Sequence, residues 1–193
     1  MFDYTEAMEG LICDIAARCP EFAHIDPDRI IVAYTQTRSP GAHGMYASVH
    51  PLRFEDGKRT TKKRGRTYVM PEVRVDGTEV LYFIYFALPR FADLDFQTKM
   101  VTVFHELYHI APSFNGDIRR FPGKNYAHGR SRKRYNERVQ ALADNYMAVE
   151  GSDRTTAFLR MSFDELRKRY GGAAGRRVKP PRPQPAQVDK PVG

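Results

Sequence analysis

Apolar residues recur at intervals of three and four positions in three parts of the chain, which predicts amphipathic helices there. The first part is residues 5–18, and the third is residues 131–149. The second is a segment that Asp93 or Asp95 can cap and that ends before Pro112. A fourth, shorter helix is expected after Ser162, because Ser162 and Glu165 have the spacing of a capping box. Gly171 is expected to end that helix.

Shorter apolar runs between the first two predicted helices indicate β-strands. They are residues 29–34, 45–54, 67–75 and 79–88. Pro51 breaks the second strand or places it at a sheet edge, because proline cannot donate to the ladder. The last two strands flank Asp76-Gly77, the dipeptide of a tight hairpin turn. Residues 80–86 are almost continuously apolar, which is typical of a strand covered on both faces.

The length of 193 residues is expected to give one domain, residues 1–170, followed by a tail, residues 171–193. The tail is rich in proline, glycine and basic residues and is predicted to be disordered, since it has almost nothing to bury. The chain has no apolar run long enough to span a bilayer, so no membrane partner is expected. The N-terminus does not resemble a signal peptide, and Cys13 and Cys19 do not form a disulfide framework. A cytoplasmic location is the expectation.

The formal net charge of +8 permits attraction to nucleic acid or another polyanion. Six basic residues lie within residues 56–66, which are expected to form a polar loop, and others lie in the tail. Charges of this kind are usually only solvated, but they can also contact phosphates. Nucleic acid is therefore a candidate partner through the basic loop and the tail.

The chemistry is concentrated in the second predicted helix, which contains His105-Glu106-x-x-His109. Side chains four residues apart lie on one helical face, so both imidazoles can reach a single ion, and they fall opposite the apolar stripe. Zinc binds neutral imidazole nitrogen and keeps one of its four positions for water in catalytic sites. Glu106 follows the first imidazole and can act as a general base for that water. The alternative is a surface helix with two unrelated histidines.

A catalytic zinc site needs a third protein ligand. The candidates are His128, in a loop before the third long helix, and Glu137 or Asp144 on that helix. His128 is favoured, because Gly129 allows a sharp turn that can bring the loop over the ligand helix. The two carboxylates remain alternatives. The remaining histidines lack partners with ligand-like spacing and are expected to be ordinary side chains; they are His24, His43 and His50.

Taken together, His105-Glu106-x-x-His109, His128-Gly129 and the aromatic-bearing helix that follows resemble the minimal zincin-type metallopeptidases. The similarity is to the SprT-like group and to phage and bacterial metallopeptidases of similar organisation, and it covers roughly residues 79–150. It implies zinc on His105, His109 and His128, with Glu106 as catalytic base. It also implies a zincin-like α+β fold, in which a small mixed or antiparallel sheet packs beside the ligand helix and a second long helix. Gln140 stands where other zincins have a liganding glutamate, which argues against a third ligand from that helix.

The resemblance implies a zinc-dependent peptidase that hydrolyses peptide bonds in a protein or peptide substrate. A donor to the oxyanion is also required. The candidates are Tyr126, Tyr135, Arg119 and Arg120, and Asp117 is a candidate for orienting a ligand imidazole. The rival hypothesis is a catalytically inactive zincin-like protein with a structural metal, which binds nucleic acid through its basic surface. No cysteine-rich zinc ribbon follows, so DNA targeting by that route is not expected.

Overall fold

The strand β8 (Tyr82–Leu88) forms the centre of the main sheet in the computed structural model, which describes residues 1–36, 44–123 and 125–186. It pairs in parallel with β2 (Ile30–Gln36) and antiparallel with β3 (Ala47–Pro51), giving the order β2-β8-β3. All seven residues of β8 are buried. The prediction of a strand covered on both faces is therefore confirmed.

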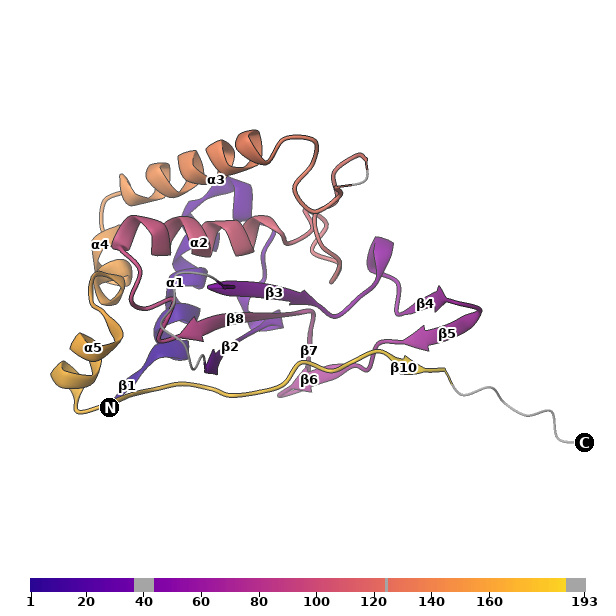
Figure 1. Ribbon diagram of the computed structural model, residues 1–193, viewed down its shortest axis with the longest axis horizontal. Helices are drawn as coiled ribbons and strands as arrows, with labels where there is room; N and C mark the ends of the chain where they lie inside the picture. The colour runs from indigo at the N-terminus through magenta and orange to yellow at the C-terminus, as the bar shows by residue number, and fades with distance from the viewer. Residues whose placement is uncertain (37–43, 124, 187–193) are drawn as a thin grey trace, which may run out of the picture.

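The two faces of this sheet are covered by different parts of the chain. On one face, Val32, Ile84 and Phe86 belong to the main core, with apolar residues of α1 (Tyr4–Arg18) and α2 (Phe96–Tyr108). On the other face, side chains of β2 and β8 form a smaller cluster with residues from the segment between β3 and β8; the cluster contains Ala33, Leu52, Met70, Val80, Phe83 and Tyr85. Figure 1 shows α2 lying along the sheet with α3 (Arg132–Met147) stacked outside it.

The predicted helices form close to their expected bounds, and capping side chains fix where they begin. Asp95 is the N-cap of α2, where its carboxylate accepts from the Thr98 N–H at 2.9 Å. Asp93 instead accepts from the N–H of Phe163. The capping box of Ser162 opens the last helix as predicted. The remaining helical elements are η1 (Pro20–Phe22), η2 (Pro27–Arg29), η3 (Glu55–Gly57), α4 (Ser152–Thr156), η4 (Ala157–Arg160) and α5 (Phe163–Tyr170).

The segment between β3 and β8 forms two hairpins, and two predictions about it are wrong. The predicted polar loop of residues 56–66 contains β4 (Thr60–Lys63), which pairs with β5 (Arg66–Val69). The predicted strand of residues 67–75 is divided between β5 and β6 (Val73–Val75), and β6 pairs with β7 (Thr78–Val80) across the expected Asp-Gly turn. A run of charges hid the first hairpin, because a two-stranded ribbon in solvent needs little apolar periodicity.

Residues 171–186 run along the body of the protein, in contrast to the disorder that their composition predicts. Strand β9 (Ala173–Ala174) pairs with β1 (Phe2–Asp3), and β10 (Gln184–Pro185) pairs with β5. The Tyr34 N–H also donates to the Arg176 carbonyl at 3.0 Å. Exposed strand edges provide backbone hydrogen bonds that require no apolar side chain, so composition does not reveal these contacts. The division into residues 1–170 and 171–193 stays a prediction.

The fold is α+β, with small sheets and five α-helices in the described ranges. Within those ranges, no helix combines the length and the apolar character needed to cross a membrane. His43 lies outside the described residues.

Candidate metal centre

Two of the predicted ligands are positioned by the C-terminal half of α2. The buried side of this helix carries Met100, Val103, Phe104 and Leu107, while His105 and His109 are half-buried on another side. His109 is the C-cap of the helix; its N–H donates to the Glu106 carbonyl, and the Ile110 N–H donates to the Leu107 carbonyl. The apolar stripe therefore fixes the helix against the sheet and leaves both imidazoles free to face a common point.

The third imidazole comes from the loop that precedes α3. A tight turn holds this loop, in which the N–H groups of His128 and Gly129 both donate to the Asn125 carbonyl, at 3.2 and 2.8 Å. Gly129 has a φ of 71°, and a Cβ there would meet the Phe121 ring at 3.3 Å. The sharp turn predicted at Gly129 is thus present, and it brings His128 over the end of α2.

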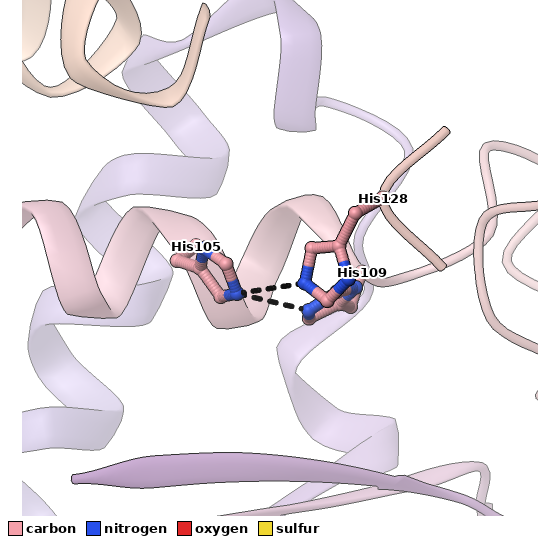
Figure 2. Close-up of side chains that lie close together, drawn as sticks. All are labelled: His105, His109 and His128. Carbon is pink, nitrogen blue, oxygen red and sulfur yellow. Dashed lines mark hydrogen bonds between the residues drawn. The ribbon is translucent and has the colours of Figure 1, made fainter. Parts of the chain in front are cut away.

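The three histidines converge on one point (Figure 2). The Nε2 atoms of His109 and His128 lie 3.1 Å and 3.4 Å from the Nε2 atom of His105. One ligand atom from each of the three residues lies within 4.8 Å of the others, so the group could hold a metal ion. Two ligands of a tetrahedral zinc site with bonds of about 2.0–2.1 Å lie about 3.3 Å apart, so the observed spacing fits such an ion.

The protonation of the three imidazoles also suits metal binding. Burial lowers the pKa of His105 to about 4 and that of His109 to about 3, and in each case the neighbouring imidazoles add to the effect. Burial also lowers the pKa of His128, with a contribution from the charge of Arg132. All three rings are therefore neutral near pH 7, which is the form that binds a metal.

Glu106 is buried beside this cluster, with 7% of its surface exposed. Burial raises the pKa of its carboxyl group to about 7, while a backbone hydrogen bond from Val49 of β3 acts in the opposite direction. A carboxyl group with a pKa near neutrality can both accept and release a proton at physiological pH. The site therefore combines a neutral imidazole cluster with a titratable carboxyl group.

A cavity of about 560 Å³ opens beside the cluster and Glu106. Its other lining residues come from residues 44–47, from α2 and from α3, and they include Thr102, Arg132 and Asn136. Arg132 lies close enough for its charge to lower the pKa values of both His105 and His128. Arg132 and Asn136 were not among the site residues predicted from the sequence. They lie four residues apart on one face of α3, but this spacing alone does not indicate that the face lines a cavity.

Of the residues predicted as oxyanion donors, Tyr135 lies at the imidazole cluster, whereas Arg119 and Arg120 contact other groups. The Tyr135 hydroxyl lies 3.4 Å from Nδ1 of His109 and 3.4 Å from the His105 carbonyl, so it contacts the ligand helix. Arg119 donates to the Tyr108 carbonyl and to Glu21. Arg120 pairs with Asp117, and its guanidinium lies over the Tyr126 ring.

The other predicted site residues lie apart from the imidazole cluster. The Asp117 carboxylate is buried and accepts from Arg120 and from the N–H groups of Asp56 and Ile118. Glu137 is exposed and pairs with Lys133, and Asp144 accepts from Gln97 and Gln140. Among the described residues, the group that could hold a metal contains only the three histidines.

A comparison with models of protein families matches residues 3–146 to the family described as "Putative phage metallopeptidase". Because the match covers most of the chain, including the histidine cluster, the chain belongs to this family. Comparisons with curated proteins and with solved structures each gave no match.

Proposed function

We propose that this chain is a zinc-dependent metallopeptidase that hydrolyses peptide bonds in a protein or peptide substrate, on a zincin-like fold. His105, His109 and His128 would hold the zinc ion, and Glu106 would be the catalytic base. The observation that carries the proposal is the convergence of three imidazoles beside a buried carboxyl group. The Nε2 atoms of His109 and His128 lie 3.1 and 3.4 Å from the Nε2 atom of His105.

Zinc is favoured over other divalent ions by the donor set. Neutral imidazole nitrogen suits zinc, whereas magnesium and calcium prefer oxygen ligands. Three protein ligands leave a fourth tetrahedral position for water, as in catalytic zinc sites. When bound, the ion would polarise the substrate carbonyl and lower the pKa of the attacking water.

Glu106 would accept a proton from the attacking water and then donate it to the departing amine. Both transfers require a carboxyl group whose pKa lies near the working pH, and burial raises that of Glu106 to about 7. Arg132 and Asn136 line the same cavity and are the proposed donors to the oxyanion. The attraction between the Arg132 charge and the oxyanion would be stronger than in water, because the dielectric constant inside a substrate-filled cleft is lower.

The position of β3 supports an extended peptide as substrate. In the described part of the chain β3 is an edge strand of the main sheet, and Glu106 faces its backbone at Val49. An extended chain can add to such an edge through main-chain hydrogen bonds. A peptide bound there would lie next to the cavity that residues 44–47 and the ligand helix form. The cytoplasmic location stays a prediction.

The test compares Glu106→Gln with His128→Ala and with Glu137→Gln, a matched substitution at an exposed glutamate on α3. Metal content is measured by mass spectrometry, and cleavage is measured on a library of peptides and on unfolded protein. Glu106→Gln should keep about one zinc per chain and lose cleavage by roughly 100-fold or more. His128→Ala should lose both, and Arg132→Gln should lower kcat while keeping the metal.

Glu137→Gln should match the wild type in both measurements. Cleavage by Glu106→Gln at the wild-type rate would refute the role of the carboxyl group. Loss of zinc from Glu137→Gln with retention by His128→Ala would show that the third ligand is misassigned.

A further inference from the structure

The β4–β5 hairpin projects away from the main sheet (Figure 1). Its end carries a concentrated positive charge. We call Lys62, Lys63, Arg64 and Arg66 the hairpin tip; all four side chains are exposed. Among the described residues, no acidic side chain forms an ion pair with any of them. Near the base of the hairpin, by contrast, Lys58 pairs with Asp56 and Arg59 pairs with Glu72 and Glu79. Within the described ranges, the tip therefore presents four cations that no acidic side chain neutralises.

The residues of the tip oppose the stability of the hairpin that carries them. Lys63 and Arg66 are direct cross-strand partners, and like charges at such a position repel one another. Arg64 adopts a φ of 50°, and Gly65 follows with a φ of 75°, in a turn that favours asparagine or glycine at the first position. An acidic residue at position 63 or 66 and an asparagine at position 64 would suit the fold better. The charge at the tip is thus not explained by folding.

The shape of the tip fits a groove of nucleic acid. Strand β10 pairs with Val69 and Tyr68, and the Ala186 N–H donates to the Thr67 carbonyl. Beyond Thr67, the described part of the chain forms a two-stranded ribbon. A ribbon of two strands can enter the major groove of duplex DNA, whose walls are rows of phosphates. Strand alternation places Lys63 and Arg66 on one face, whereas Lys62 points to the opposite face. Cations on both faces can reach the phosphates on both sides of a groove.

We propose that the hairpin tip binds the phosphate backbone of duplex nucleic acid, independently of base sequence. The four cations would contact phosphate oxygens along the walls of the groove, and contacts of this kind are electrostatic and carry no sequence information. This binding does not depend on the peptidase activity proposed above, so either function can fail while the other stands.

The test measures fluorescence anisotropy of a labelled 30-base-pair duplex between 50 and 200 mM NaCl. The tip variant carries Lys62→Gln, Lys63→Gln, Arg64→Gln and Arg66→Gln. The control variant also removes four positive charges, from α4 and α5 at the other end of the molecule, through Arg154→Gln, Arg167→Gln, Lys168→Gln and Arg169→Gln (Figure 1). Both variants have the same net charge, so only the position of the removed charge differs.

Each phosphate contact contributes about −0.9 to the slope of log K against log salt, so four contacts contribute about −3.6. These contacts alone would weaken wild-type binding about 50-fold between 50 and 150 mM salt. The tip variant should lose most of this slope, and the control variant should keep it. A second variant, Lys63→Thr with Arg64→Asn, should lose about half of the slope while keeping or raising Tm, because both changes favour the hairpin.

Three results would overturn the proposal. Equal losses in the tip and control variants would show binding to general positive charge. If the variant Lys63→Thr with Arg64→Asn kept the full slope of log K against log salt, the tip would not be part of the interface. Binding of polyglutamate by the wild type, without binding of the duplex, would identify an acidic protein as the partner instead.

Discussion

The buried carboxyl group of Glu106 makes a prediction about the stability of the metal-free protein that needs no substrate. Burial raises the pKa of this group from 4.5 to about 7. The folded protein therefore holds a proton on Glu106 at pH values where the unfolded chain has released it. Because the folded state binds more protons in this range, the stability contributed by the protonated carboxyl is full below pH 4.5 and is lost as the pH rises to about 7.

The substitution Glu106→Gln keeps the shape of the side chain and removes its titration. As the pH rises, the wild type loses the stability that the protonated carboxyl contributes, whereas the variant does not. We therefore expect the variant to become more stable relative to the wild type with increasing pH. With pKa values of 4.5 and about 7 in the two states, the change between pH 5.5 and pH 8.5 is about 2 kcal/mol. The histidines of the cluster titrate in both proteins, so most of their contribution cancels in this difference.

The assay is urea denaturation of both proteins in the presence of a chelator, followed by circular dichroism at several pH values. Glu137→Gln serves as the control for the substitution itself, because Glu137 is exposed on α3. A repeat with saturating zinc should show a smaller dependence on pH, because a nearby cation stabilises the carboxylate. A stability difference that is constant from pH 5.5 to pH 8.5 without metal would refute the inference that burial holds Glu106 protonated.

Two further substitutions test how the surrounding structure supports the site. Tyr135→Phe removes the hydroxyl that lies 3.4 Å from Nδ1 of His109, and it should weaken zinc affinity about 10- to 100-fold in a chelator competition, whereas Tyr126→Phe at an exposed ring should not. Lys99→Met removes the buried ammonium group that donates to the carbonyls of Leu159 and Met161, and it should lower the free energy of unfolding by about 2–4 kcal/mol without changing zinc affinity. Equal zinc affinity of Tyr135→Phe and the wild type, or an unchanged unfolding midpoint for Lys99→Met, would contradict these assignments.

Local periodicity was sufficient to predict the parts of the site that lie on one helix. The apolar stripe and the capping residue Asp95 give both the bounds of α2 and the common face of His105 and His109. The place of His128 depended on a single glycine, because only a turn at Gly129 returns the loop to the helix. These features are encoded within a few residues of where they act, and a sequence pattern can therefore reveal them.

Features that depend on pairing between distant segments were not predictable in this way. The cavity includes Arg132 and Asn136 because α3 packs on α2, and no local pattern specifies that packing. The pairing of β10 with β5 joins residues more than one hundred positions apart through backbone atoms, which carry no side-chain signature. The β4–β5 hairpin was hidden because its sequence is dominated by charge and not by alternation.

The arrangement of the chain separates the metal centre from the hairpin tip. The three histidines come from α2 and from the loop before α3, and the start of α3 lines the cavity beside them. The Arg119 N–H donates to the His109 carbonyl and links the two histidine-bearing segments. The hairpin is inserted between β3 and β8, and its base is tied to the body where the Leu52 N–H donates to the Leu81 carbonyl and the Arg53 N–H donates to the Gly116 carbonyl. Changes at the tip therefore need not move the imidazoles. The surface proposed to bind a polyanion and the site proposed to bind a metal can be altered independently in this fold, which is why their two tests can give separate answers.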